Sequence, residues 1–586
     1  MSYDFTLRVA GESGEGVITI GETVGRLAAR EGLNLITFRT FPAEIKGGPC
    51  MIQLRLSDQK VAYHGEKVDC LVTLNQAALD ENIADLREDG VLLCEAECEL
   101  PAEPSSRTVY QLPFDRLAVR EIGSRISKNI VVLGALAHLL KIPKKRIEEF
   151  LTERFARKGQ AILEHNRKAL ETGTRVAEAK VSPKNAFRFP KGTDQARMLI
   201  TGNEAIALGA TVAGMRYFFG YPITPASEIM EWLAAHLPKL GGKVLQTEDE
   251  ISAICGVAGA SWAGGRAMTA TSGPGVSLMS ETIGLLSIAE IPAVIVDSQR
   301  GGPSTGMPTK TEQSDLLLAV YGSHGDAPRL VIAPIEECLS MIGLAFDLAE
   351  KYQLPAIFLV DQALSARLET VDPAAAKRAP AAARLCADGG GVNNFARYRL
   401  GESAVSPAAI PGTPRCEHMV TGMEHDELGN FACDDETHTA MTVKRFRKLA
   451  AVESDPLSRG LSSQFGDSNA DIGIVTWGSS AGPVEEAVKV AEQQGIAVRA
   501  IVPKILNPLP HEELRRFFQS VKKVIVPELN FVGQFASLLR STYRIPTISL
   551  TKIKGVPLEP SEILSVIGET AASLSVRRTS RYGSAR

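Results

Sequence analysis

Apolar runs of strand length alternate with amphipathic helical patterns along most of the chain. In the first 185 residues, runs such as FTLRVAG (5–11) and CLVTLN (70–75) flank helical patterns such as GVITIGETVGRLAAREG (16–32). The alternation returns between Met198 and about Asp361, and again from Asp471 onward. Strands that alternate with helices in this way are typical of parallel sheets with right-handed crossovers. The pattern predicts an α/β protein with three parallel-sheet, Rossmann-like units.

The alternation is interrupted at two places. A Lys-, Pro- and Arg-rich link, KVSPKNAFRFPKGTDQAR, occupies 180–197, and residues 362–465 show no periodicity and carry runs such as DPAAAKRAPAAA. So long an irregular stretch is either a functional covering segment or a flexible link. A chain of 586 residues is too long for one core. We therefore expect four parts: 1–185, 186–365, an irregular connecting segment 366–465, and 466–586.

Charge and hydropathy narrow the class of protein. The formal net charge is −4, which gives no reason to expect nucleic acid or an anionic membrane as partner. The longest apolar stretch, 130–140, is about half a membrane span. The chain opens on a strand-like run with an early Asp rather than a basic and then apolar preface, so it lacks the pattern of a secretory signal. These features predict a cytoplasmic protein.

The segment MRYFFGYPITPASE (215–228) carries the first candidate site. An apolar strand leads into Thr224, which we expect to be a helix N-cap, and Pro225, which we expect to be the first helical residue. A hydroxyl and free backbone N–H groups at a helix N-terminus form a site for a carboxylate or phosphate.

A second candidate is the acidic run QTEDE (246–250). It stands directly before ISAICGVAGASWAGG, a helix of small and apolar residues that suits a tightly packed core. An acid at the mouth of an apolar helix can have a raised pKa and transfer protons.

Two further strand-to-helix corners add a glycine turn and an arginine. Ser272 and Gly273 begin the turn SGPG after one strand, and Arg300 follows the strand IPAVIV in the run DSQRGGPSTG (297–306). Arg300 could grip a carboxylate with two hydrogen bonds, or form a salt bridge that stabilises a long loop. Its coincidence with Thr224 and Glu250 favours one pocket, because ligands bind at the carboxyl ends of strands in such sheets.

Two glycine-containing motifs in the first 50 residues have plainer alternatives. GESGEG (11–16) has the position of a dinucleotide fingerprint but not its spacing, and its glutamates would repel a pyrophosphate, so a tight turn is the favoured interpretation. Lys46 and Gly47 could admit a phosphate or thioester group, and a plain hairpin turn is at least as good an interpretation.

The cysteine pattern argues against a metal site. None of the nine cysteines forms a CxxC pair, and the spacings needed for an iron–sulfur cluster are absent. One region superficially resembles a metal cluster, but its spacings match no zinc pattern, so we expect no metal ligands in this chain. Its residues are Cys416, His418, His425, Cys433 and His438.

Together these motifs resemble a known family. Residues 202–234, 247–281 and 296–326 strongly resemble the alpha subunit of 2-oxoacid:ferredoxin oxidoreductases, and about the first 180 residues resemble the gamma unit of that family, fused ahead of alpha. The segments RYRLGESAVSPAAIPGTP and TGMEHDELG are similar to the branch that acts on 2-oxoglutarate. DIGIVTWGSSAGPVEEA (471–487) resembles the transketolase C-terminal domain, whose usual role is packing and dimerisation.

The resemblance implies a thiamine diphosphate enzyme that acts with a beta subunit. The implied reaction is reversible oxidative decarboxylation of 2-oxoglutarate with coenzyme A to succinyl-CoA and carbon dioxide, with electrons passing to ferredoxin. In the family, alpha holds the aminopyrimidine of the cofactor, whereas beta holds the diphosphate, magnesium and a 4Fe-4S cluster. A second copy of the chain, in a heterotetramer, is also implied.

The family's site residues map onto this sequence as follows. Glu250 best matches the activating glutamate, with Glu248 as the other candidate, and Thr224 and Arg300 are the candidates for holding the substrate carboxylate. Ala226 stands where the family usually has Ser, so no hydroxyl role transfers there. The implied cofactor contacts are Tyr221, Pro222, Ile223, Glu250, Ser272 and Gly273, with Lys46 and Gly47 for coenzyme A.

Alternative functions remain open from the sequence. Pyruvate or a branched 2-oxoacid could replace 2-oxoglutarate, because specificity can depend on the beta chain. A thiamine enzyme with an acceptor other than ferredoxin, or a nucleotide-binding assembly subunit without activity, would share the same α/β pattern.

Overall fold

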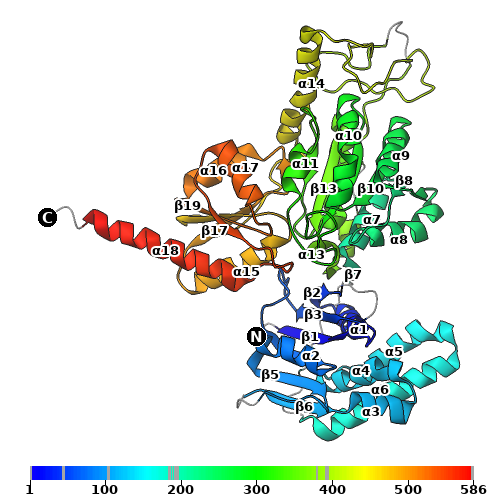
Figure 1. Cartoon of the computed structure of the whole chain (residues 1–586), viewed down its shortest axis with the longest axis vertical. Helices are drawn as coiled ribbons and strands as arrows, with labels where there is room; N and C mark the ends of the chain where they lie inside the picture. The colour runs from blue at the N-terminus through cyan, green and yellow to red at the C-terminus, as the bar shows by residue number, and fades with distance from the viewer. Residues whose placement is uncertain are drawn as a thin grey trace. The chain divides into compact units, whose positions relative to one another are not determined.

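The computed structural model describes residues 3–42, 47–101, 106–182, 187, 189, 197–377, 381–389 and 395–582, with side chains up to Ser575 (Figure 1). These residues form two compact units. The first unit comprises residues 1–200 and 367–373, and the second comprises residues 201–366 and 374–586.

The first unit is built on an eight-stranded sheet. Its strand order is β6-β5-β4-β1-β3-β2-β14-β7, and β1 runs parallel to β4 but antiparallel to β3. The sheet is therefore mixed rather than wholly parallel. The strands are β1 (Asp4–Glu12), β2 (Asn34–Thr40), β3 (Pro49–Ser57), β4 (Val68–Thr73), β5 (Leu86–Glu95), β6 (Thr108–Leu112), β7 (Met198–Thr201) and β14 (Leu368–Val371).

Strand β14 reaches this sheet from far along the chain. Glu369 pairs antiparallel with Ile36 of β2, and the backbone N–H of Leu35 donates to Thr370 Oγ1 at 2.9 Å. The pairing covers the edge of β2 that does not pair with β3 and that would otherwise be an open sheet edge.

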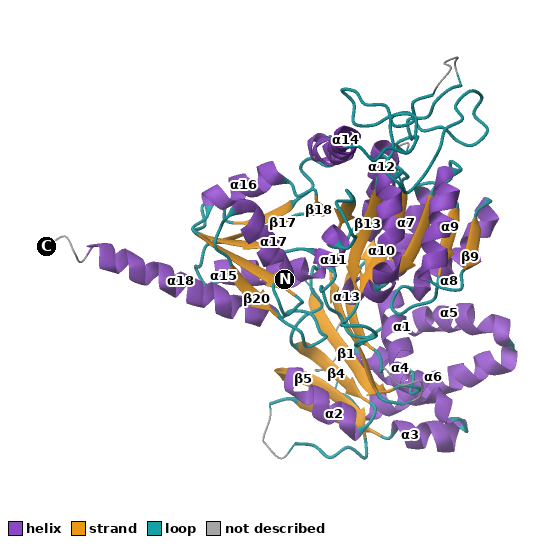
Figure 2. Ribbon diagram, turned by 45° about the horizontal axis from the view of Figure 1, so that its top comes forward, coloured by secondary structure: helices purple, strands orange, loops and turns teal. Residues whose placement is uncertain are grey.

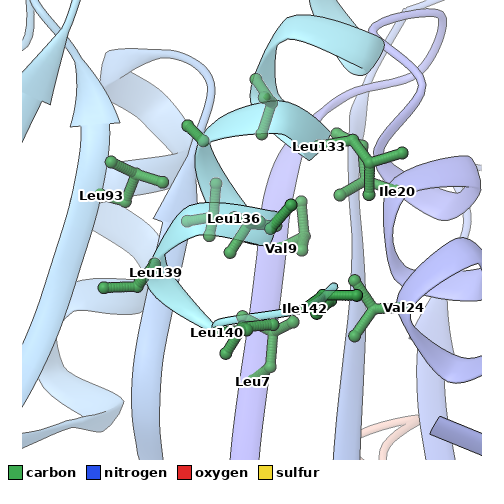
Figure 3. Packing of buried hydrophobic residues seen from close by; sticks show 14 of the residues in the cluster. Leu7, Val9, Ile20, Val24, Leu93, Leu133, Leu136, Leu139, Leu140 and Ile142 are labelled. Carbon is green, nitrogen blue, oxygen red and sulfur yellow. The ribbon is translucent and has the colours of Figure 1, made fainter. Parts of the chain in front are cut away.

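An apolar helix forms the centre of this unit's core. Helix α4 (Lys128–Leu139) is apolar on all sides, which is typical of a helix buried in a core. Figure 3 shows its leucines in front of Val9 of β1, with Ile20 and Val24 of α1 on one side and Leu93 of β5 on the other. A Cβ atom on Gly173 of α6 would lie 1.9 Å from the carbonyl oxygen of Val131, so the glycine permits the close contact of α4 with α6. The other helices are α1 (Val17–Arg30), α2 (Gln76–Asn82), α3 (Phe114–Arg116), α5 (Lys144–Phe155) and α6 (Gln160–Lys180).

A seven-stranded sheet forms the centre of the second unit. Its order is β18-β12-β13-β11-β10-β8-β9, and its strands are parallel except for β18, which pairs antiparallel with β12. The strands are β8 (Tyr217–Gly220), β9 (Lys243–Gln246), β10 (Ala267–Thr271), β11 (Ala293–Gln299), β12 (Leu330–Ile332), β13 (Pro355–Asp361) and β18 (Ile505–Asn507).

Helices lie on both faces of this sheet (Figure 2). Helix α7 packs against α8 and α12, whereas α9 packs against α10 and α10 against α11. The helices are α7 (Gly202–Val212), α8 (Ser227–His236), α9 (Glu250–Trp262), α10 (Gly273–Ile288), α11 (Leu316–Tyr321), α12 (Cys338–Tyr352) and α13 (Gln362–Ser365).

The C-terminal part of the second unit has its own five-stranded sheet, in the order β15-β17-β16-β19-β20. Its apolar residues share one core cluster with α9, α10 and α11, so the two sheets belong to one packed body. The elements are β15 (Ser463–Gly466), β16 (Ile472–Val475), β17 (Val498–Val502), β19 (Lys523–Glu528), β20 (Ile548–Thr551), α15 (Ala481–Gln493), α16 (His511–Ser520), α17 (Gln534–Tyr543) and α18 (Pro560–Tyr582). The expected fold class, three α/β sheet units, is confirmed.

The expectation of no regular structure in 362–465 is wrong for α14 (Asp435–Ser454), a 20-residue helix. Its buried side is partly charged: Lys444, Arg445 and Lys448 are at most 7% exposed. A helix that buries cations shows no apolar stripe in its sequence, which is why hydrophobic periodicity missed it.

Glu290 supplies the counter-charge for the buried lysines of α14. Its two carboxylate oxygens form ion pairs with Lys444 and Lys448, the latter at 2.6 Å. Burial opposes ionisation of Glu290, but the ammonium groups of Lys448 and Lys444 and the guanidinium of Arg397 lower its pKa to about 2. Since Arg397 lies in the irregular segment, this cluster connects segment 395–433 to the sheet domain.

Across the part of the chain that the structure describes, no helix is long and apolar enough to cross a membrane.

Candidate functional site

The four corners singled out from the sequence lie on neighbouring strands. Strands β11, β10, β8 and β9 are adjacent and parallel, so their carboxyl ends lie along one edge of the sheet. The segments that follow them carry Arg300, Ser272, Thr224 and Glu250 respectively. The prediction that these corners share one sheet edge is confirmed by the strand order.

Glu250 is the first residue of α9 and is only 6% exposed. The N-cap is Asp249, whose side chain accepts from Ser252 N at 2.7 Å, so Asp249 serves the helix terminus and leaves Glu250 free of that role. Among the described residues, the Glu250 carboxylate has no hydrogen-bond partner. Glu248 is exposed, so burial distinguishes the two candidate glutamates in favour of Glu250.

Glycine at 275 makes room for this carboxylate. A Cβ atom on Gly275, in the first turn of α10, would lie 1.9 Å from Thr271 Oγ1 and 3.0 Å from Glu250 Oε1. The turn SGPG thus brings the start of α10 against both the strand end and the acid.

Arg300 and Thr224 are brought together, but through the backbone. Arg300 Nη1 donates to the Thr224 carbonyl oxygen at 2.6 Å, and the arginine is 7% exposed. The predicted N-cap role of Thr224 is wrong: helix α8 starts at Ser227, with Ala226 at the N-cap position and no side-chain cap. The physical reason is a turn ahead of the helix, in which Ala226 N and Ser227 N both donate to Ile223 O. The hydroxyl of Thr224 therefore stays free for another partner.

The remaining predicted cofactor contacts are divided between surface and interior. Tyr221 is 42% exposed and Pro222 is exposed, while Ile223 is half-buried. Ser272 is fully buried and its Oγ has no partner among the described residues.

A cavity of about 690 Å³ opens beside Arg300. This volume is in the range of small-molecule sites. One side of the cavity is lined by Gly273 and by the polar residues Arg300 and Asp315. Apolar lining comes from the C-terminal part, through Phe531, Val532 and Ile553. Tyr221, Thr224 and Glu250 are not among the lining residues, so the cavity is the arginine side of the site.

Two aspartates on either side of Arg300 in the sequence, Asp297 and Asp315, were not selected by sequence reasoning as site residues. Asp297 lies in β11, whose residues are all buried, and neither of its oxygens has a hydrogen-bond partner among the described residues. Asp315 lines the cavity, and a Cβ atom on Gly273 would lie 2.4 Å from its Oδ2. Burial is the main cause that raises both pKa values, that of Asp315 to about 6, and the Asp315 charge raises that of Asp297 further. A charged residue inside the apolar run AVIVDSQ is the signal that could have found Asp297.

Gln313, which is fully buried, joins the loop between Arg300 and α11 to the C-terminal part by hydrogen bonds. Its Nε2 donates to Asp361 Oδ2 and to Trp477 O, both at 3.1 Å, and its backbone N–H donates to Leu529 O at 2.7 Å. Gln534 of the C-terminal part adds a further hydrogen bond to this loop, from its Nε2 to Ser314 O at 2.5 Å. The C-terminal part therefore holds one wall of the cavity.

The turn GESGEG (11–16) in the first unit is filled by the side chain of Glu15. Glu15 Oε2 accepts from Glu12 N at 2.8 Å and from Asn75 Nδ2 at 3.0 Å, and Oε1 accepts from Lys128 Nζ at 2.9 Å. A carboxylate thus sits where the turn would otherwise receive an anion, which agrees with the tight-turn interpretation.

The predicted coenzyme A contact at Lys46 lies outside the described residues. Gly47 has φ +79° and its Cβ position would be 3.7 Å from Glu12 Oε1. Strands β2 and β3 on either side of this loop pair antiparallel, as a hairpin connection requires.

The Cys- and His-containing segment uses its histidines in other contacts. The His425 ring packs on Tyr398 with centroids 4.0 Å apart, and His438 Nδ1 is 2.6 Å from Glu424 Oε2. In the described ranges, no three His, Cys, Asp or Glu side chains are grouped so that they could hold a metal ion.

Comparison with known families assigns all three sheet regions to oxidoreductases. Residues 208–444 match the family model described as pyruvate flavodoxin/ferredoxin oxidoreductase, thiamine diP-binding. Residues 6–176 match pyruvate ferredoxin/flavodoxin oxidoreductase, and residues 470–553 match pyruvate:ferredoxin oxidoreductase core domain II. The fold is thus that of a subunit of a thiamine diphosphate-binding oxidoreductase.

Full-length relatives define the family more narrowly. The chain is 34% identical to 2-oxoglutarate oxidoreductase subunit KorA of Mycobacterium tuberculosis, over 95% of this chain and 90% of that protein. It is 36% identical to 2-oxoglutarate synthase subunit KorA of Methanothermobacter marburgensis, over 63% of this chain and 97% of that protein. The chain belongs to the alpha subunits of the 2-oxoacid:ferredoxin oxidoreductase family, as its motifs led us to expect.

One solved structure is similar over nearly the whole chain. It is a 2-oxoglutarate:ferredoxin oxidoreductase from Magnetococcus marinus with 2-oxoglutarate, coenzyme A and succinyl-CoA bound. The TM-score is 0.91 at 39% identity, and the match covers 97% of this chain and 99% of that chain.

Proposed function

We propose that this chain is the alpha subunit of a thiamine diphosphate-dependent 2-oxoglutarate:ferredoxin oxidoreductase. The reaction is the reversible oxidative decarboxylation of 2-oxoglutarate with coenzyme A to succinyl-CoA and carbon dioxide, with the electrons passing to ferredoxin. The observation that carries the proposal is the placement of a buried, unpartnered Glu250 and a buried Arg300 on one sheet edge. The full-length likeness to an enzyme with 2-oxoglutarate and coenzyme A bound supports this choice of substrates.

The residues around Glu250 fit the aminopyrimidine of thiamine diphosphate. A buried carboxyl group with no protein partner can exchange a proton with a ring nitrogen, and Gly275 lets the first turn of α10 lie close to this carboxylate. When bound, the cofactor supplies the electron sink that decarboxylation of a 2-oxoacid requires. The role of Glu250 is to hold and move the proton at the ring nitrogen. Ser272 and Gly273, with Tyr221, Pro222 and Ile223, would line the ring.

Arg300 is the group that would hold the substrate's carboxylate. Its Nη1 is already oriented by the Thr224 carbonyl, and its Nε has no partner among the described residues, so this edge of the guanidinium can bind an anion. The free hydroxyl of Thr224 can add a hydrogen bond to the same carboxylate.

The remaining parts of the reaction belong to partners. We propose a beta subunit that holds the diphosphate, magnesium and a 4Fe-4S cluster, ferredoxin as the acceptor, and a second copy of this chain in a cytoplasmic heterotetramer. Coenzyme A would contact the Lys46–Gly47 loop.

The test is turnover by the chain purified with its beta subunit. We expect coenzyme A-dependent reduction of ferredoxin with 2-oxoglutarate, at a kcat/KM at least about tenfold above that for pyruvate or a branched 2-oxoacid, a difference of about 1.4 kcal/mol. A preference for pyruvate would overturn the substrate, and reduction of another acceptor only would overturn ferredoxin. No turnover of any 2-oxoacid would overturn the function.

A further inference from the structure

We propose that a cavity between the C-terminal end of α14 and the start of α16 binds a basic α-amino acid, a ligand with two positive groups and one carboxylate. The cavity has a volume of about 620 Å³, which is in the range of small-molecule sites. Among the described residues, it has no lining residue in common with the cavity beside Arg300. It therefore adds a second candidate site to the same unit.

Two half-buried glutamates of the cavity wall each present a carboxylate oxygen to a ligand. Glu453, in the last turn of α14, accepts a hydrogen bond from the backbone N–H of His511 through Oε1 at 3.1 Å. Glu513, in the first turn of α16, accepts from the backbone N–H of Gly460 through Oε1 at 2.9 Å. In the part of the chain that the structure describes, the second oxygen of each glutamate has no hydrogen-bond or ion-pair partner. The backbone thus orients both carboxylates, and each can bind one ammonium group.

The end of helix α14 favours a positive group at the same place. Its last residues, including Ala450 and Ser454, line the cavity together with Glu453. The carboxyl end of a helix carries a partial negative charge that stabilises cations within the last turn. An ammonium group beside Glu453 therefore meets both a carboxylate and the helix end.

A hydroxyl and a guanidinium group stand ready for the ligand's carboxylate. Ser458 is only 8% exposed, lines the cavity, and its Oγ has no hydrogen-bond partner among the described residues. Arg459 follows it in the wall, and no acidic side chain of the described residues pairs with its guanidinium group. A carboxylate that accepts from both groups removes the cost of a buried hydroxyl without a partner.

The charges of the wall match those of a basic amino acid. Glu512 and Arg516, one turn apart on α16, form an ion pair with each other. The lining charges that lack a counter-charge in the described residues are then two carboxylates, Glu453 and Glu513, and one guanidinium, Arg459. A basic amino acid brings two positive groups and one negative group at neutral pH, so it balances all three. A dicarboxylic acid would add to the negative excess.

The rest of the wall suits the methylene chain of such a ligand. Apolar lining comes from Val452 of α14, Ile505 of β18, Pro508 and Pro510. Burial of methylene groups against these residues adds affinity without a requirement for direction.

The experiment is calorimetric titration and thermal unfolding of the holoenzyme with three related compounds. L-Lysine carries all three charged groups, L-norleucine lacks the side-chain ammonium group, and cadaverine lacks the carboxylate. We expect L-lysine to bind and to raise the unfolding midpoint with increasing concentration. L-Norleucine and cadaverine should each bind at least about tenfold more weakly, because each leaves a charged group of the wall without a partner.

Two variants assign the contacts. Arg459→Gln should weaken the binding of L-lysine by at least about tenfold and leave that of cadaverine unchanged, because it removes the cation that holds the carboxylate. Glu513→Gln should weaken L-lysine to a similar extent, and its amide oxygen can still accept from the backbone N–H of Gly460. Glu492→Gln, at an exposed position of α15, is the matched control and should bind as the wild type does. The unfolding midpoint without ligand reports whether each variant is folded.

Three results would overturn the proposal. The first is the absence of both heat and a midpoint shift with L-lysine at about 10 mM, a concentration that detects even weak sites. The second is binding of L-norleucine or cadaverine as tight as that of L-lysine, and the third is unchanged affinity in a folded Arg459→Gln. Since none of these measurements needs turnover, their outcome is independent of the proposed function.

Discussion

Glu250 and Gly275 touch across the first turns of two neighbouring helices, α9 and α10. A Cβ atom on Gly275 would lie 2.9 Å from Glu250 Cγ, closer than real Cβ contacts allow, and 3.0 Å from its Oε1, which is a tight contact. The position of the Glu250 carboxylate therefore depends on residue 275, at the start of α10, being a glycine.

Gly275→Ala should reduce kcat by about two orders of magnitude while the chain stays folded. The new methyl group must displace Glu250 or Thr271, and a displacement of about 1 Å in an active site can cost that much. Steady-state kinetics and a thermal melt measure the two effects. Gly284→Ala on the same helix is the matched control, since nothing lies within 4 Å of its Cβ position. Equal activity of both variants would contradict the contact's role.

Glu250→Gln should lower 2-oxoacid-dependent dye reduction by at least about two orders of magnitude, as expected when a general acid–base group is lost. Glu248→Gln, two residues away and exposed, should keep most of the activity. If the two variants lost activity to the same extent, burial would not identify the proton-transfer group, and full activity in Glu250→Gln would remove it from the mechanism.

Arg300→Ala should raise the KM for 2-oxoglutarate by about 30-fold or more, because a lost charged hydrogen-bond partner costs about 2 kcal/mol or more. Arg300→Lys should restore only part of the affinity, since an ammonium group cannot make the two-pronged contact of a guanidinium. Initial-rate kinetics at saturating coenzyme A measure the KM for 2-oxoglutarate of both variants. An unchanged KM and kcat in Arg300→Ala would rule out its contact with the substrate.

Glu290→Gln should destabilise the second unit by about 3–5 kcal/mol at pH 7, because it leaves Lys444 and Lys448 buried without an anion. The pKa of Glu290 is lowered, so its contribution is present above the pKa of the unfolded chain and is lost as pH falls toward about 2. Thermal or urea unfolding at pH 7 measures the loss.

Lys448→Met is the matched variant for this cluster. Burial, together with the neighbouring lysine, outweighs the attraction of Glu290 and lowers the pKa of Lys448 to about 7. We expect Lys448→Met to cost less than Glu290→Gln, because Lys444 still pairs with the carboxylate. A larger loss in Lys448→Met would show that Glu290 is not the centre of the cluster.

Sequence periodicity succeeded where burial is apolar. The strands and helices around β8, β10 and β11 show it clearly, and their alternation predicted the parallel strands that the structure has. Periodicity failed for α14, whose buried side includes Lys444 and Lys448, and for Thr224, where a turn precedes the helix.

The amino-acid sequence by itself determined the α/β class, the family, and the residue types at the four corners, because local patterns and motif spacing carry that information. Only the tertiary structure decided which glutamate is buried and that Arg300 reaches the Thr224 carbonyl. Those relationships join residues on different strands. Their energies depend on burial and on the charges nearby, and both quantities exist only once the chain has packed.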